Sequence, residues 1–173
     1  MHSDDIPPRA REIHSTSIVF DTHADTPQRF LFDNFDLGRH ATDGCVDIPC
    51  LREGGVSAIF FALWVPVEIT GPKATRRVLD LLDAVAEQLR RHPDDLTLAT
   101  CSDEVRAAHS QGKIAVLMGV EGGHAIDNNL DVLRNFFARG VRYMTLTHNA
   151  ATDWADSANQ SRGTMASPDS AGK

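Results

Sequence analysis

The sequence alternates apolar runs of strand length with segments of helical periodicity, and this alternation constrains the fold more than any other feature. Residues 56–65 and 114–120 are almost continuously apolar, and residues 141–147 form a further predicted strand. Strands without polar positions are typical of a parallel sheet that is covered on both faces. Residues 73–92 carry apolar side chains at helical spacing. The pattern therefore predicts βαβ units with right-handed crossovers.

A shorter apolar run, residues 18–20, ends in polar and ionisable residues. In an extended chain residues i and i+2 point to the same side, so His23 and Asp25 share a face. An imidazole and a carboxylate on one face form a good half-site for a divalent metal. Alternatively, His23 is a hydrogen-bonded loop histidine and Asp25 caps a helix that starts near Pro27. Taken alone, these two residues do not decide between the two interpretations.

The other elements are predicted from periodicity and from capping residues. They are a surface helix at 9–14, a helix at 28–32, a loop at 33–44, a strand at 96–101, a helix at 102–112 and a helix from Asp127 or Asn128 to Gly140.

Ionisable residues also follow two later strands. Glu121 and His148 each come directly after a predicted strand. Because the carboxyl ends of parallel strands lie side by side, we expect both to meet His23 and Asp25 at one edge of the sheet. Imidazole nitrogens and carboxylate oxygens bind zinc and can leave an open position for water. The competing interpretation, a helix cap at each strand end, must be invoked three times, so the residues favour a metal site.

The remaining histidines have simpler interpretations. His124 either supports a metal ligand from behind or belongs only to its turn. The residues predicted to be solvated are His2, His14, His40, His92 and His109, and those predicted to be loop acids are Asp43 and Asp47.

Composition argues against several functional classes. The net charge is -7, and the absence of a Lys/Arg cluster argues against nucleic acid as a partner. No apolar run approaches the ~20 residues that span a bilayer, and the N-terminus lacks the pattern of a secretory signal. Cys45, Cys50 and Cys101 have no Cys-x-x-Cys spacing and indicate reduced thiols. We therefore expect a cytoplasmic protein without a membrane partner.

Four ordered motifs resemble the N-terminal half of membrane dipeptidases (renal dipeptidase, peptidase family M19) of the soluble bacterial type. They are FDTHADTP at 20–27, VDIPCLREGGV at 46–56, GVEGGH at 119–124, and RYMTLTHN at 142–149 with WADS at 154–157.

The resemblance implies a (β/α)8 TIM-type barrel of the metal-dependent hydrolase kind with two zinc ions. By resemblance, His23 and Asp25 bind the first zinc ion and Glu121 bridges both. His148 would contact the substrate and stabilise the tetrahedral intermediate. The implied activity is hydrolysis of a dipeptide, or a related small amide, by hydroxide held at zinc.

The sequence departs from that family in length. Later strands of the family supply two further zinc-binding histidines, a substrate-binding Arg and a proton-transferring Asp, and these strands are missing here. A (β/α)8 barrel takes ~250 residues, so residues 1–157 are expected to form an N-terminal part, truncated after about half the strands. Residues 158–173 are expected to be disordered, and a frameshift between Ser157 and Gly163 would explain them.

The main interpretation is a zinc dipeptidase that is truncated in this chain, whose activity remains to be tested. Two alternatives remain open. One is another amidohydrolase-type metallohydrolase, although those usually carry His-x-His on the first strand, where this chain has His-x-Asp. The other is a half-barrel that binds metal without catalysis. A half-barrel also exposes sheet edges and apolar strand faces, which predicts self-association.

Overall fold

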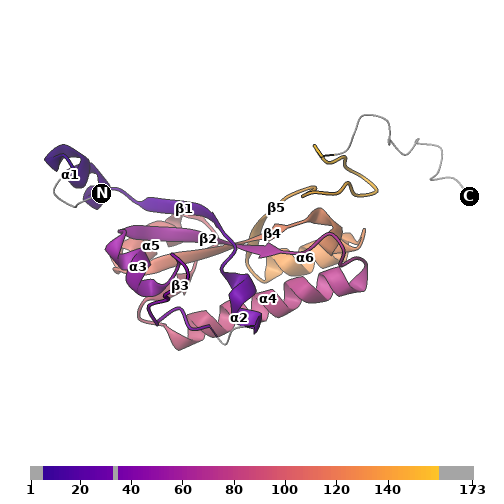
Figure 1. The fold of residues 1–173 in the computed structure, drawn as a ribbon, viewed down its shortest axis with the longest axis horizontal. Helices are drawn as coiled ribbons and strands as arrows, with labels where there is room; N and C mark the ends of the chain where they lie inside the picture. Colours follow the sequence, from indigo (N-terminus) through magenta and orange to yellow (C-terminus); the bar gives the residue numbers. More distant parts are fainter. Residues whose placement is uncertain (1–5, 33–34, 160–173) are drawn as a thin grey trace, which may run out of the picture.

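The computed structural model describes residues 6–32 and 35–159 of the 173-residue chain. In chain order the elements are α1 (Pro8–Thr16), β1 (Val19–Ala24), α2 (Pro27–Phe32), α3 (Ile48–Glu53), β2 (Val56–Trp64), α4 (Pro72–Arg91), β3 (Leu96–Leu98), α5 (Ser102–Ser110), β4 (Ile114–Glu121), the 3-10 helix η2 (Gly123–Ile126), α6 (Leu130–Ala138) and β5 (Val141–Met144). Figure 1 shows the strands side by side, with α2 and α4 along one face of the sheet.

The five strands form one parallel sheet. Its order is β1-β2-β4-β3, and β5 also pairs with β4. β3 pairs with the start of β4 and β5 pairs with its end, so both lie on the edge of β4 that β2 leaves open. Because all strands run in one direction, their carboxyl ends meet at a single edge. The predicted parallel sheet is confirmed.

The two faces of the sheet are covered differently. On one face, Ile59, Phe61 and Leu63 of β2 are fully buried against the helices, with Val78 and Leu81 of α4 in the same core. Full burial of such side chains contributes about 1.5–3 kcal/mol each. This agrees with the predicted amphipathic helix at 73–92.

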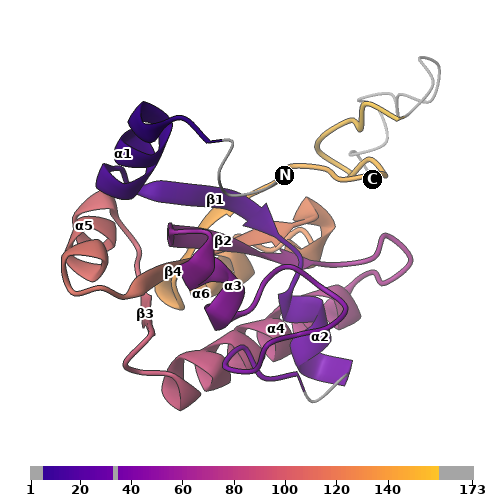
Figure 2. The same cartoon turned by 60° about the vertical axis from the view of Figure 1, so that its left-hand side comes forward.

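The opposite face is built from small residues where a helix covers it. Ala58 and Ala115 are buried against Val105 and Ala108 of α5. Small side chains let α5 approach the strands closely, and Figure 2 shows strands between α5 and the helices α2 and α4.

Beyond α5, the same face carries a row of aromatic rings, which we call the aromatic row: Phe20, Phe60 and Tyr143. Phe20 stacks on Phe60 with ring centroids 5.6 Å apart, and Phe60 contacts Tyr143 at 4.9 Å. Tyr143 fits because its register partner is Gly119, where an added Cβ would lie 2.1 Å from the ring. Phe20, at the outer end of the row, is 39% exposed.

The sequence did not predict α3, and Asp47, which was predicted to be a loop acid, lies at the end of the loop as the cap of this helix. Asp47 is fully buried and caps α3, accepting hydrogen bonds from the backbone N–H of Cys50 at 2.7 Å and of Ala41 at 2.8 Å. Burial raises the pKa of this carboxyl, but these hydrogen bonds outweigh burial and hold its pKa below the ordinary value.

His92 was expected to be solvated, and this is also wrong. Its side chain is only 18% exposed, and its Nε2 lies 2.6 Å from Oδ1 of Asp36. His14, His40 and His109 are exposed as expected, and His14 also lies 2.8 Å from the carbonyl oxygen of Gly54.

Several element boundaries differ from the prediction, and β3, predicted at 96–101, ends at Leu98. Asp127 and Asn128 have φ values of 50° and 54° and do not cap α6. Asn129 caps it instead by accepting from the N–H of Asp131. β5 ends at Met144 rather than at residue 147. The next residue, Thr145, leaves the strand, and its hydroxyl oxygen accepts a hydrogen bond from the backbone N–H of Gly122.

His2 lies outside the described residues, and so does the predicted disordered segment at 158–173, except for residues 158 and 159. Residues 145–159 are irregular apart from one bridge between Thr152 and Ala155. Within the described ranges, no helix has both the length and the apolar character needed to cross a membrane.

Candidate metal centre

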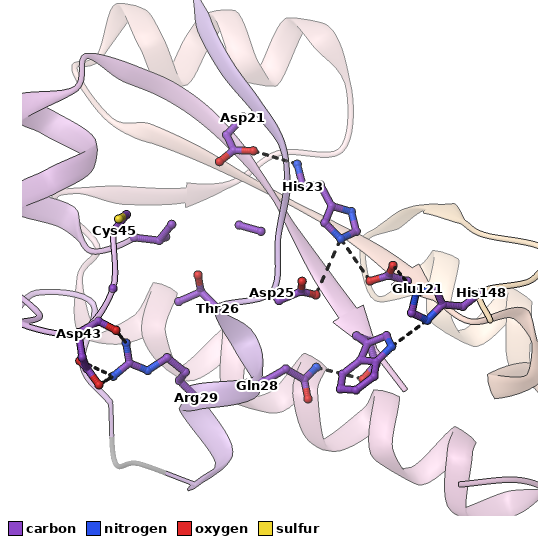
Figure 3. A pocket seen from close by; sticks show the side chains of 14 residues that line it. Asp21, His23, Asp25, Thr26, Gln28, Arg29, Asp43, Cys45, Glu121 and His148 are labelled. Carbon is purple, nitrogen blue, oxygen red and sulfur yellow. Dashed lines mark hydrogen bonds and ion pairs between the residues drawn. The ribbon is translucent and has the colours of Figure 1, made fainter. Parts of the chain in front are cut away.

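Three strand ends bring the predicted metal ligands together. His23 lies in β1, Asp25 follows that strand directly, and Glu121 is the last residue of β4. Nε2 of His23 is 3.2 Å from Oε2 of Glu121 and 3.8 Å from Oδ1 of Asp25. Figure 3 shows the three side chains converging at one side of a pocket.

The helix-cap interpretation of Asp25 accounts for only part of what is found. The backbone carbonyl of Asp25, rather than its carboxylate, accepts the N–H of Gln28 at the start of α2. The carboxylate turns toward His23. Within β1, the side chain of Asp21 accepts a hydrogen bond from the backbone N–H of His23 at 3.0 Å, where the pairing with β2 is irregular.

His148 lies at the same edge, on the segment after β5. Its Nε2 is 3.5 Å from Oε1 of Glu121, so the two oxygens of Glu121 face different histidines. On its other side, Nδ1 accepts a hydrogen bond from the indole N–H of Trp64 at 3.0 Å. In a neutral imidazole whose Nδ1 accepts, the proton resides on Nε2.

Two aromatic residues at this site were missed from the sequence. Trp64 is the last residue of β2 and pairs in register with Glu121, and its place two residues before Pro66 was the available signal. The Tyr143 hydroxyl lies 3.2 Å from Nδ1 of His23. Burial raises the pKa of Tyr143, and the nearby charges of Glu121 and Asp25 raise it further. The phenol is therefore neutral at physiological pH.

His124 lies beside this centre in η2. Burial lowers its pKa, a hydrogen bond to the carbonyl of Pro66 opposes that effect, and the charge of His148 lowers the pKa again. Its Nε2 is buried and has no hydrogen-bond partner among the described residues. Gly122, with φ 120°, leaves room for the ring, since a Cβ there would lie 2.6 Å from Cε1 of His124.

A cleft of about 730 Å³ opens in front of these side chains. Its far wall carries Arg29, which pairs with Asp43 at 3.0 Å, and Cys45. On its floor, Gln28 donates to the carbonyl of Trp64 at 3.0 Å. Figure 3 shows this arrangement, with Asp25, Glu121 and the two histidines gathered opposite Arg29.

The donor set fits a zinc ion. His23, Asp25 and Glu121 each offer one ligand atom, and these atoms lie within 4.8 Å of one another. Zinc bonds of about 2.0–2.1 Å in a tetrahedron place nitrogen and oxygen ligands about 3.4 Å apart. The separations of 3.2 and 3.8 Å bracket that value.

Comparison with known proteins gives consistent results. The family model "Membrane dipeptidase (Peptidase family M19)" matches residues 8–172. Dipeptidase 3 of Mus musculus is 38% identical over 149 residues, covering 83% of this chain and 29% of that protein.

Two solved structures with the same fold are described as a dipeptidase and a metallo peptidase. A dipeptidase described as a metallo peptidase of family M19 has a TM-score of 0.71 at 25% identity, covering 78% of this chain and 44% of that one. A Rhodobacter sphaeroides metallo peptidase liganded with a phosphinate mimic of the dipeptide L-Ala-D-Ala has a TM-score of 0.72 at 22% identity, covering 79% and 47%.

The chain thus spans less than half the length of these relatives. Its five parallel strands correspond to part of a TIM-like barrel, which confirms the predicted fold class. The family match over most of the sequence confirms the resemblance read from the four motifs. This chain belongs to the membrane dipeptidase family, peptidase family M19.

Proposed function

We propose that this chain carries part of the active site of a zinc-dependent dipeptidase. The observation that supports this most strongly is the meeting of His23, Asp25 and Glu121 with His148 at the carboxyl edge of the sheet. That edge is where the active sites of barrel enzymes form. The relative bound to a dipeptide mimic supports a dipeptide, or a similar small amide, as substrate.

His23, Asp25 and Glu121 would hold the first zinc ion. His23 can present the lone pair of Nε2, because the oxygen of the neutral Tyr143 hydroxyl is in place to accept a hydrogen bond from Nδ1–H. Glu121 directs Oε2 toward His23 and Oε1 toward His148. With its oxygens aimed at separate groups, Glu121 would be able to help hold a second zinc ion, which would need ligands beyond these residues.

His148 would act as a hydrogen-bond donor to the substrate. The Trp64 indole occupies its Nδ1, so Nε2–H, which faces Oε1 of Glu121 at 3.5 Å, is the donor that His148 offers at the cleft. A donor fixed in this way can stabilise negative charge that develops on an amide oxygen. His124, whose burial favours the neutral form, would support His148 without adding charge. The chemistry that bound zinc supplies is polarisation of the amide carbonyl and a lower pKa for water.

Zinc titration of the chelator-treated 173-residue chain tests the ligand set. We expect His23→Ala to abolish binding at this site, whereas His109→Ala, on the exposed face of α5, leaves it unchanged. Zinc at 100 times its dissociation constant should raise the free energy of unfolding by about 2.7 kcal/mol. Equal binding by the wild type and the His23→Ala variant would refute the assignment.

Dipeptide hydrolysis separates catalysis from metal binding. Turnover by this chain would support a catalytic unit, whereas zinc binding without turnover would support the metal-binding half-barrel. We also propose a cytoplasmic location, since Cys45, Cys50 and Cys101 are all free, as is usual in a reducing compartment.

A further inference from the structure

A second group of ligand-type side chains lies at the start of α3. We call it the loop cluster: His40, Asp47 and Cys50. Each offers one ligand atom, and the three atoms lie within 4.8 Å of one another. The cluster shares no residue with the centre formed by His23, Asp25 and Glu121, and the proposed dipeptidase chemistry does not use it.

The separations within the loop cluster match those of a zinc site. Nδ1 of His40 lies 3.6 Å from Sγ of Cys50 and 3.5 Å from Oδ2 of Asp47. Tetrahedral zinc, with bonds of about 2.3 Å to sulfur and 2.0–2.1 Å to nitrogen or oxygen, places S and N about 3.6 Å apart and N and O about 3.4 Å apart. By contrast, 3.5 Å is long for a direct N–H···O hydrogen bond, for which about 2.7–3.2 Å is usual.

Asp47 is held in place before any ion arrives. It is fully buried, and two backbone N–H groups fix its carboxylate. Each carboxylate oxygen has a second lone pair, so both hydrogen bonds can persist while Oδ2 binds a cation. The amino end of α3 carries at most about half a positive charge, which the Asp47 carboxylate and a Cys50 thiolate together outweigh.

The ligand types select the metal. Thiolate and imidazole prefer borderline or soft ions such as zinc, whereas magnesium and calcium prefer oxygen ligands alone. The His40 side chain is 65% exposed, so an ion can enter from solvent. A fourth position remains for water.

We propose that the loop cluster is a second zinc site with a structural role. Zinc there would tie residues 40–47 to the first turn of α3. That loop carries Asp43 and Cys45, which line the cleft, so the ion would stiffen one wall of the candidate metal centre.

Cobalt binding tests this proposal independently of the dipeptidase centre. Co²⁺ added to the chelator-treated chain produces a near-ultraviolet charge-transfer band only when a thiolate binds it, and His23, Asp25 and Glu121 offer no sulfur. We expect one such band, which zinc displaces. It should disappear in Cys50→Ser and weaken at least tenfold in apparent affinity in His40→Ala, and far-ultraviolet circular dichroism verifies that both variants fold.

Matched variants complete the design. Cys101→Ser and His109→Ala change exposed residues of the same types at α5, and His23→Ala removes the other centre, so all three should retain the band. The proposal is overturned by the absence of a thiolate band in the wild type. It is equally overturned by a band that persists in Cys50→Ser, or one that depends on Cys101.

Discussion

Replacing Trp64 by Phe tests whether the indole sets the protonation of His148. The substitution removes the N–H that Nδ1 of His148 accepts at 3.0 Å. It keeps an aromatic ring near the position where Trp64 now meets the imidazole edge to face, with centroids 6.3 Å apart and an interplanar angle of 86°. The substitution therefore isolates the hydrogen bond better than Trp64→Ala would.

The expected magnitude follows from that one contact. A hydrogen bond between neutral, partly buried groups contributes about 1 kcal/mol. Since 1.4 kcal/mol is a factor of ten, Trp64→Phe should shift the ratio of Nε2–H to Nδ1–H forms of His148 about fivefold toward Nδ1–H. The free energy of unfolding should fall by about the same 1 kcal/mol.

Nitrogen-15 NMR of the histidine rings, at a pH where the imidazole is neutral, measures this ratio. Trp154→Phe is the matched control, because its indole donates at the same 3.0 Å distance but to Asn128. The reasoning fails if wild-type His148 carries its proton on Nδ1, or if Trp64→Phe and Trp154→Phe leave the same ratio.

Three further predictions concern stability and assembly. Burial raises the pKa of Asp36, but the N–H of Gly38 and the contact with His92 outweigh burial and lower this pKa below its ordinary value of 3.8. Asp36→Asn should therefore lower the free energy of unfolding by about 1.5 kcal/mol at neutral pH. Denaturant titrations should show that cost in full above about pH 4 and diminishing as the pH falls, because the ionised carboxylate is the stabilising form. Gly119→Ala places a Cβ 2.1 Å from the Tyr143 ring and should lower the free energy of unfolding by about 1–3 kcal/mol; an unchanged melting temperature would contradict this. Light scattering should show an average molar mass that rises with protein concentration, and this rise should be smaller in Phe20→Ser. A wild-type protein that stays monomeric at all concentrations would refute self-association through the aromatic row.

Periodicity made the sheet and its largest helix visible in the sequence. Residues 56–65 and 114–120 have no polar face, which leaves few options other than a buried parallel strand. α3 was missed because six residues are too short to display a helical period. Asp127 and Asn128 resemble capping residues in sequence, yet their positive φ values place them in a turn.

The candidate site was visible only in part, for a similar reason. His23, Asp25 and Glu121 stand out because ionisable residues are unusual at the ends of apolar strands. Trp64 and Tyr143 were missed because an aromatic residue in a strand usually serves the core. Their contacts with histidines depend on the register between strands, and register cannot be read from one strand alone.

The aromatic row gives the uncovered face of the sheet a connection to the metal centre. Phe20 contacts Phe60, Phe60 contacts Tyr143, and Tyr143 contacts His23. Any segment or protein that covers Phe20 would favour one arrangement of these rings, and so one position of the His23 imidazole. Thermodynamic linkage then requires the reverse effect. If covering the aromatic row changes the zinc affinity of His23 by some factor, zinc at His23 would change the affinity of the row for the covering segment by that same factor.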